Sequence, residues 1–212
     1  MRESGIYQMY LKNLLDRLLA LVGTAALSWL LILLGIAIHL DSPGPIFFRQ
    51  KRAGKNGTYF YIYKFRTMRI DTPHDMPTHM LNNPDLFITR VGRFLRKTSL
   101  DELPQLFNIL KNDMAVVGPR PERPEIAAQY EQDIPEFHLR LQVKAGLTGY
   151  AQVYGKYNTT PLDKLKLDLI YIAQRSVLFD LRILFYTIKI IFIPESTEGI
   201  PDGQSTADVK TK

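Results

Sequence analysis

The sequence contains no cysteine among its 212 residues. The chain therefore forms no disulfide framework and offers no thiolate as a metal ligand or nucleophile. Any catalysis by this chain must depend on oxygen and nitrogen groups.

Charged residues are absent from the 23 consecutive positions from Leu18 to Leu40. As an α-helix with a rise of about 1.5 Å per residue, this segment would reach roughly 34 Å, which is enough to cross a bilayer. A cleaved signal peptide is the alternative, but its apolar core is normally about 7–15 residues long and a small-residue cleavage site follows it. Here Asp41-Ser42-Pro43-Gly44-Pro45 follows, so we predict a membrane helix that is retained.

Both flanks of this apolar segment are basic. The cations are Arg2, Lys12 and Arg17 before it and Arg49, Lys51, Arg52 and Lys55 after it. Because basic flanks prefer the cytoplasm, the segment is expected to enter and leave through one leaflet as a re-entrant helix. A spanning helix with a tolerated positive flank is the alternative. Gly23, Ser28 and Gly35 are weak candidates for the bend.

The whole chain is basic, with a formal net charge of +6 and a pI near 9.4. This balance favours an acidic partner such as nucleic acid, an anionic membrane face or a phosphate-bearing substrate. The cations border apolar, membrane-like sequence and no reading motif is present, so nucleic acid is not expected as a partner. The length suits one domain with appendages.

The segment after the membrane helix predicts a β-hairpin. Two runs rich in aromatic and β-branched residues, 45–50 and 58–65, flank Asn56-Gly57, and both of these turn residues tolerate positive φ. Residues 70–86 contain three prolines and predict a long loop, in which His74 and His79 are more typical of exposed histidines than of metal ligands.

Amphipathic helices are predicted farther along the chain. Arg90, Arg93, Arg96 and Lys97 recur at helical spacing, and such a basic face meets either solvent or lipid and substrate phosphates. A second helix is expected over 162–172, and the apolar stretch 177–193 is interrupted by charges, so it packs on the core or the bilayer surface and does not cross. The fold class predicted is mainly helical α+β, with a re-entrant membrane helix, a short hairpin and interfacial helices.

The main candidate for chemistry is the run from Thr98 to Leu110. Thr98 or Ser99 is expected to cap a helix that carries Asp101 and Glu102 in its first turn. Acidic residues there are often only stabilisers. A carboxylate at such a site is also able to hold a divalent cation or attack phosphorus, and Mg²⁺ prefers one or two carboxylates together with phosphate oxygens.

Two glycine-containing motifs follow. In Gly118-Pro119-Arg120-Pro121, prolines on both sides fix the backbone around Arg120, which suits bidentate recognition of a phosphate. An exposed arginine in a plain proline turn is the alternative. In the run 144–153, Gly146 and Gly149 would let the backbone approach a ligand closely.

Taken in order, these segments resemble the bacterial sugar transferase family, the monotopic phosphoglycosyl transferases. The resemblance runs from about residue 11 to 193. It is carried by five motifs, which are Asp41-Ser42-Pro43-Gly44-Pro45-Ile46-Phe47-Phe48-Arg49-Gln50, Tyr63-Lys64-Phe65-Arg66-Thr67-Met68, the run from Ser99 to Leu110, Val117-Gly118-Pro119-Arg120-Pro121 and Gly146-Leu147-Thr148-Gly149.

The resemblance implies an enzyme that moves a sugar 1-phosphate from a UDP-sugar to undecaprenyl phosphate and releases UMP, at the first membrane step of polysaccharide or glycoconjugate biosynthesis. It implies a membrane-inserted helix over 1–44, a catalytic domain at the cytosolic face of the bacterial cell membrane over 45–193, and a polar tail over 194–212. Membrane lipids are expected partners, and a homodimer is allowed.

The resemblance also assigns the site. Asp101 matches the family nucleophile, which forms a covalent phosphosugar intermediate, and Glu102 matches its acidic partner, so that both are expected to bind Mg²⁺. Arg96 and Arg120 match basic positions expected near phosphate.

The sequence departs from the family pattern at three places. Lys144 and Lys156, also expected near phosphate, replace the arginines of Arg-Pro-Gly and Gly-Arg-Asn, and each substitution keeps a cation but loses the arginine fork. Ser28-Trp29 replaces the Ser-Pro that often breaks the membrane helix.

Two functions from other classes compete with this interpretation. A non-enzymatic membrane-tethered module would bind lipid head groups or polyanions through its basic face, and Asp101 would then have no special role. An ordinary nucleotide-sugar glycosyltransferase would release the nucleotide diphosphate; many such enzymes use an Asp-X-Asp triplet, which is absent from this sequence.

Overall fold

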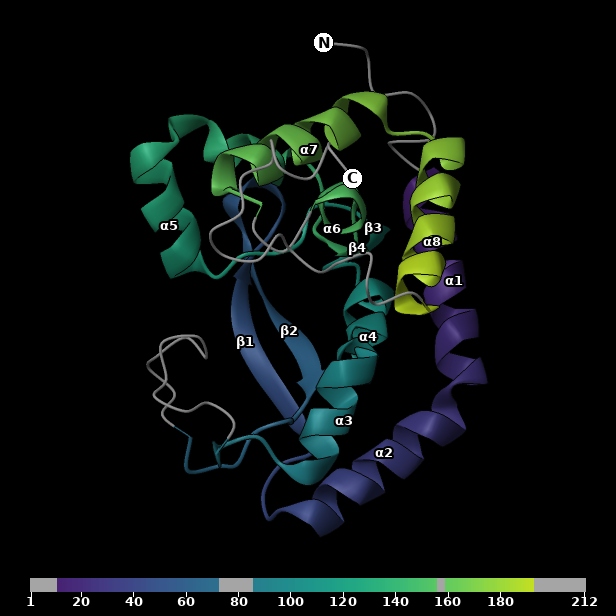
Figure 1. Ribbon diagram of the computed structural model, residues 1–212. Helices are drawn as coiled ribbons and strands as arrows, with labels where there is room; N and C mark the ends of the chain where they lie inside the picture. The colour runs from purple at the N-terminus through teal and green to yellow at the C-terminus, as the bar shows by residue number, and fades with distance from the viewer. Residues whose placement is uncertain (1–10, 73–85, 156–158, 193–212) are drawn as a thin grey trace, which may run out of the picture.

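The computed structural model describes residues 11–72, 86–155 and 159–192 (Figure 1). In chain order the helices are α1 Lys12–Ala26, α2 Ser28–Asp41, α3 Arg90–Thr98, α4 Gln105–Leu110, α5 Pro124–Asp133, α6 Tyr150–Tyr154, α7 Pro161–Gln174 and α8 Val177–Phe192, and the strands are β1 Phe47–Ala53, β2 Tyr59–Phe65, β3 Ala115–Val117 and β4 Gly146–Thr148. Within this part of the chain the strands form two two-stranded sheets. The predicted class, mainly helical α+β, is confirmed.

The apolar N-terminal segment is broken into two helices, α1 and α2. They meet at Leu27, whose backbone leaves the helical region, and their axes bend by 62°. In the described residues neither helix alone is long and apolar enough to cross a membrane, whereas the bent pair together meets that criterion of length and composition. The bend forms beside Ser28, whose hydroxyl donates to the carbonyl oxygen of Ala25 (2.8 Å), so no proline is required.

Each helix of the bent pair has one face against the protein and another face that is apolar and exposed. Ala20 of α1 is buried against α4 and the hairpin, and Ile38 of α2 is buried with Phe65 and Leu95. The large exposed apolar side chains of the pair are Leu14, Leu18, Leu19, Leu21, Val22, Trp29, Ile32, Leu33, Ile36 and Leu40. An apolar surface this extensive is typical of contact with lipid.

The predicted hairpin is confirmed. β1 pairs antiparallel with β2 in a register that runs from Phe47 opposite Phe65 to Ala53 opposite Tyr59. The turn contains Asn56 and Gly57 at φ values of 56° and 75°, the left-handed region that these two residues tolerate. In Figure 1 the hairpin runs from the α2–α3 end of the molecule towards α5.

The expected helix that starts at Ser99 is wrong. Helix α3 ends at Thr98, and Ser99 lies in the left-handed region (φ 56°) as its C-terminal cap. A short 3₁₀ helix, Leu100–Glu102, follows, and α4 begins only after Pro104. Neither Thr98 nor Ser99 caps a helix N-terminus, because Thr98 donates back to the carbonyl of Phe94 and Ser99 makes no side-chain cap.

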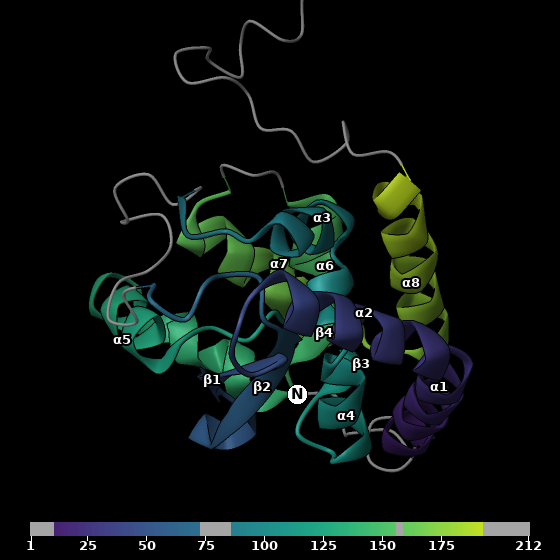
Figure 2. The same cartoon turned by 90° about the horizontal axis from the view of Figure 1, so that it is seen from below.

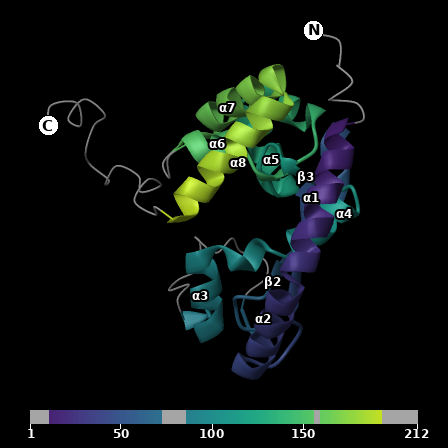
Figure 3. The ribbon, with the colours of Figure 1, turned by 90° about the vertical axis from the view of Figure 1, so that its right-hand side faces the viewer.

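Helices α5 to α8 lie together in a second layer of the molecule. Figure 3 shows α2 and α3 at one end of the molecule, α5 to α8 at the other, and α1 running between them. The parallel pair β3–β4 lies under α7 and α8, where Val117 packs with Tyr171 and Ile183. Figures 1 and 2 both place α8 beside α1, and Lys12 joins them through Asp180 (2.7 Å).

The predicted helix over 162–172 is confirmed as α7, and α8 packs on the core through Ile183 without meeting the criterion for a membrane span. The polar tail predicted from residue 194 and most of the loop predicted over 70–86, with His74 and His79, lie outside the described residues.

Asn108 connects α4 to the hairpin. Its side chain is fully buried, accepts from the backbone amide of Tyr63 (2.9 Å) and donates to the carbonyl of Tyr61 (2.8 Å). Replacing Asn108 with alanine leaves both backbone groups without this partner, so we expect a loss of about 2–4 kcal/mol in the free energy of unfolding. Thermal denaturation in detergent measures the loss. The exposed Gln129→Ala variant is the control, and an equal effect of the two substitutions would contradict this role of Asn108.

Candidate active site

Two adjacent carboxylates and two cations meet beside the 3₁₀ helix Leu100–Glu102. Lys64 Nζ lies 2.7 Å from Glu102 Oε1 and 3.8 Å from Asp101 Oδ2. Arg120 binds Glu102 through both terminal nitrogens, at 2.6 and 3.3 Å. The side chains of Asp101 and Glu102 are only 15% and 18% exposed, so both carboxylates are largely removed from water, whereas the Arg120 side chain is 47% exposed.

Three elements distant in sequence deliver these groups. Lys64 is on the face of β2 that also carries the buried Phe60 and Ile62, so it points inward. The 3₁₀ helix is anchored by Leu100 and Leu103, which pack against Phe65 and Leu95. Arg120 follows β3, which the pairing with β4 holds in place.

The two carboxylates are held differently. Glu102 is bound by both cations, whereas Asp101 accepts no side-chain hydrogen bond from the described residues. Burial raises the pKa of Asp101, and the nearby Lys64 only partly offsets this rise. Burial alone would also raise the pKa of Glu102, but Arg120 and Lys64 together lower it to about 2. Asp101 is therefore the more basic and the less engaged of the two carboxylates, and both properties favour a nucleophile over a purely structural group.

The low pKa of Glu102 predicts a pH-dependent stability. Because the pKa falls from 4.5 to about 2 on folding, the ionised Glu102 stabilises the protein fully above pH 4.5, and this contribution is lost as the pH falls towards 2. Relative to Glu102→Gln, we expect an advantage on the order of 3 kcal/mol at pH 7 that shrinks below pH 4.5. Melting of both proteins between pH 7 and 3 tests this, and a constant difference would contradict it.

The other expected phosphate ligands are placed differently. Arg96 Nε donates to Thr67 Oγ1 (2.9 Å), and the Arg96 charge is near enough to Asp101 to oppose part of the rise that burial causes in the pKa of that carboxyl. Lys144 instead binds the side-chain oxygens of Asn13 and Asn112, so its contacts join α1 to the end of α4 and do not include the two carboxylates. Lys156 lies outside the described residues.

The carboxylate pair suits a divalent cation. Asp101 and Glu102 supply the one or two carboxylates that Mg²⁺ prefers, and a bound substrate would supply phosphate oxygens. No group of three or more acidic or histidine side chains that could hold a metal exists among the described residues. The pair therefore fits a cation that arrives with its substrate better than a cage made wholly of protein.

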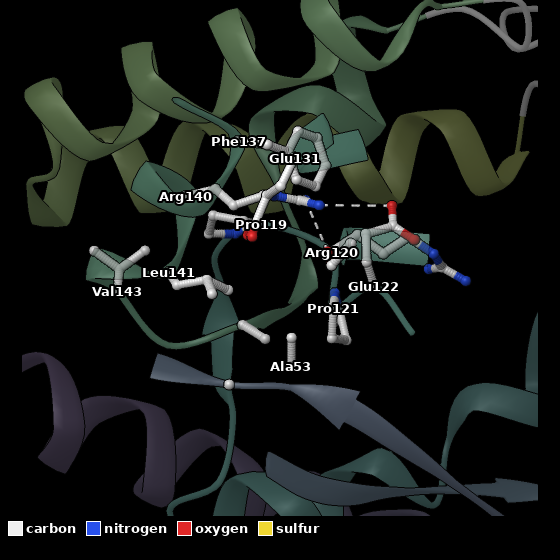
Figure 4. Close-up of a pocket in the computed structure, with 13 residues that line it drawn as sticks. Ala53, Pro119, Arg120, Pro121, Glu122, Glu131, Phe137, Arg140, Leu141 and Val143 are labelled. Atoms are coloured by element: carbon white, nitrogen blue, oxygen red, sulfur yellow. Dashed lines mark hydrogen bonds and ion pairs between the residues drawn. The ribbon is translucent and has the colours of Figure 1, made fainter. Parts of the chain in front are cut away.

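A small cavity lies behind the Arg120 loop (Figure 4). The walls come from the hairpin tip at Ala53 and Gly54, from residues 119–122, from α5, and from the 3₁₀ helix Pro135–Gln142. The guanidinium of Arg120 points away from this cavity, whereas that of Arg140 reaches the carbonyl of Arg120 (2.8 Å). The cavity therefore lies among the residues that hold the Arg120 loop in place, and not at the two carboxylates.

Lys64 is a residue of the candidate site to which the sequence pattern assigned no role. It lies in the motif Tyr63-Lys64-Phe65-Arg66, and its signal was the strand alternation that puts it on the face of Phe60 and Ile62. A lysine on the inward face of a strand needs an acidic partner, and Glu102 provides it.

Comparison with known proteins gives a consistent result. The family model for bacterial sugar transferase matches residues 7–194. The chain is 39% identical over 196 residues to the UDP-glucose:undecaprenyl-phosphate glucose-1-phosphate transferase of Xanthomonas campestris pv. campestris, covering 88% of this chain and 40% of that protein. It is 38% identical over 191 residues to the UDP-N-acetylgalactosamine-undecaprenyl-phosphate N-acetylgalactosaminephosphotransferase of Aeromonas hydrophila, covering 89% and 45%.

A third relative, the exopolysaccharide production protein PSS of Rhizobium leguminosarum bv. phaseoli, is 37% identical over 199 residues, covering 90% of this chain and 98% of the relative. The chain thus spans less than half of the first two proteins and nearly all of the third.

Proposed function

The chain belongs to the bacterial sugar transferase family, and from this membership we propose that it transfers a sugar 1-phosphate from a UDP-sugar to undecaprenyl phosphate and releases UMP. The observation that carries the proposal is the half-buried pair Asp101–Glu102, held between Lys64 and Arg120 beside a bent apolar helix pair. A lipid-linked acceptor requires an enzyme at a membrane, which fits that helix pair, and the basic flanks favour the cytosolic face.

In the proposed first step a carboxylate oxygen of Asp101 attacks the phosphorus that bears the sugar. A bond forms between that oxygen and phosphorus, the bond to the bridging oxygen breaks, and UMP leaves with that oxygen. In the second step an oxygen of undecaprenyl phosphate attacks the same phosphorus, which frees Asp101 and yields the lipid diphosphate sugar. Because the two substrates meet the enzyme in turn, ping-pong kinetics are expected.

The other side chains have distinct proposed roles. Lys64 and Arg120 hold Glu102 ionised and place positive charge where phosphate oxygens gather, and Arg96 adds a third cation near Asp101. Asp101 and Glu102 would hold Mg²⁺, which neutralises phosphate charge when bound. The contacts of Lys144 with Asn13 and Asn112 favour a structural role for this lysine.

The nucleotide product tests the proposal directly. Purified protein in detergent is mixed with Mg²⁺, undecaprenyl phosphate and each of a panel of UDP-sugars. Release of UMP with one donor would both support the proposal and identify the sugar. Release of UDP would instead indicate an ordinary glycosyltransferase, and release of neither nucleotide with any donor would favour a non-enzymatic membrane module.

We also propose that the bent pair is re-entrant, so that both of its ends face the cytosol. The absence of cysteine lets single introduced cysteines report this, and Arg17→Cys and Lys51→Cys are exposed positions on the two flanks. A membrane-impermeant maleimide is expected to label neither variant in intact cells and both in inverted vesicles. Labelling of one variant from each side would contradict the re-entrant topology without affecting the chemistry.

A further inference from the structure

The loop that carries Arg120 has no regular secondary structure, yet donors from outside it bind four consecutive carbonyl groups. Residues 119–122 follow β3 and precede α5. Their carbonyls accept, in order, from the amide of Gly146 (2.9 Å), Arg140 Nη2 (2.8 Å), Arg52 Nη1 (2.9 Å) and the amide of Ala53 (3.0 Å). Since neither Pro119 nor Pro121 has an N–H group, the loop depends on these donors to fix its path.

Two of the four donors are guanidinium groups from different elements. Arg52 reaches Pro121 from β1, and its other terminal nitrogen donates to Gln50 Oε1 (2.6 Å). Arg140 reaches Arg120 from the 3₁₀ helix Pro135–Gln142. The loop is thus held from both sides, by the hairpin and by the helical layer.

The Arg140 side chain is itself fixed by its surroundings. It is 5% exposed, pairs at 2.8 Å with Asp168 of α7, which is 1% exposed, and lies over the ring of Phe137 (4.9 Å). Figure 4 shows its guanidinium reaching the Arg120 carbonyl and the Glu122 side chain, which is 3.6 Å away. A buried pair of this kind is seldom more stabilising than apolar side chains of similar volume, so its value lies in the geometry it imposes.

The position of the loop determines how Arg120 meets the carboxylate pair. The Arg120 carbonyl and its guanidinium belong to one residue, so fixing the carbonyl restricts where the guanidinium reaches. The guanidinium binds Glu102 with two nitrogens, a fork that tolerates little displacement. A displacement of about 1 Å in such a group can cost about 100-fold in rate.

We propose that Arg52 and Arg140 are positioning residues for the transfer reaction and act through Arg120. Neither contacts Asp101 or Glu102; each binds a carbonyl of the loop and so sets the place of the Arg120 guanidinium. This inference rests on the proposed function, because it assigns these residues a part in the same reaction.

A double-mutant cycle tests the inference. Arg140→Lys and Arg52→Lys keep the charge but lose the fork, and Arg120→Ala removes the group through which they act. At saturating donor we expect kcat for UMP release to fall about tenfold in each lysine variant and about 100-fold in Arg120→Ala. Arg120→Ala/Arg140→Lys and Arg120→Ala/Arg52→Lys are then expected to match Arg120→Ala alone within about twofold.

The kcat values of the double variants decide whether each arginine acts through Arg120. If the losses multiply, to about 1,000-fold in either double variant, that arginine does not act through Arg120 and its part of the inference is overturned. The inference also fails if kcat in both lysine variants stays at the wild-type value. Arg175→Lys is the matched control, because Arg175 donates to the carbonyl of Ile172, outside the loop; its kcat should not change.

Melting temperatures and wild-type UMP release complete the test. Melting temperatures show whether a lysine variant is folded, and because Arg52 and Arg140 lie in different elements, failure of one variant to fold leaves the other to decide. If wild-type protein releases no UMP with any donor, the proposed function fails before the variants are compared. If wild type is active and the losses multiply, only the positioning inference fails.

Discussion

Asp101→Asn is expected to lower the rate of UMP release at least about a thousandfold, because an amide oxygen is too weak a nucleophile to form the phosphosugar intermediate. The substitution keeps the size of the side chain. Lys64 and Arg120 bind the neighbouring Glu102, at 2.7 and 2.6 Å, and do not depend on Asp101 for these contacts, so the surrounding site should persist. The measurement is UMP release by purified protein with Mg²⁺, undecaprenyl phosphate and the active UDP-sugar, together with mass spectrometry of the phosphosugar adduct.

Asp163→Asn is the matched control for this loss. Asp163 is an acidic residue in the first turn of α7, where it pairs with the cap Thr160 and with Lys166 at the surface. Because this carboxylate is exposed, its substitution should leave turnover within about twofold of wild type. Native turnover by Asp101→Asn would end the proposed mechanism and leave Asp101 without a part in the reaction.

Local signals in the sequence predicted the elements that local physics determines. The hairpin follows from Asn56-Gly57, because few residue pairs accept positive φ at both turn positions. Helix α3 follows from the spacing of its cations; its N-terminal cap, Thr89, which accepts from the amide of Gly92 (2.9 Å), was not predicted. The parallel pair β3–β4 was not predicted, since two strands of three residues that are separated by the 28 residues 118–145 carry no local pattern.

The site was predicted in part. The motifs led to Asp101, Glu102 and Arg120, and the structure brings these three together, but it places them on a 3₁₀ helix and a loop instead of at a helix N-terminus. The error came from Ser99, a good N-terminal cap by residue type that here adopts a left-handed C-terminal cap of α3. Arg52 and Arg140 act through backbone carbonyls, and such tertiary contacts leave no trace in residue spacing.

Lys64→Met is expected to lower kcat for UMP release about 100-fold, because it removes a preorganised cation from a largely buried site. Methionine keeps the length and the apolar stem of the side chain. Lys64 is the group that lies between the two carboxylates, at 2.7 Å from Glu102 and 3.8 Å from Asp101. Without it the two adjacent negative charges repel each other, and binding of a UDP-sugar diphosphate adds further negative charge. The loss should therefore appear in kcat and in the affinity for the donor.

Lys111→Met controls for the loss of a positive charge near the same strand. Lys111 is exposed and donates to the hydroxyl of Tyr63 (2.8 Å), the residue next to Lys64, but it contacts neither carboxylate. Its substitution should change kcat less than about twofold, since an exposed charge is screened by water and salt. Lys64→Arg should recover part of the activity if charge at this position is what matters. Equal kcat values for Lys64→Met and Lys111→Met would show that Lys64 has no part in the reaction. Arg120 would then be the cation at Glu102 on which the rate depends.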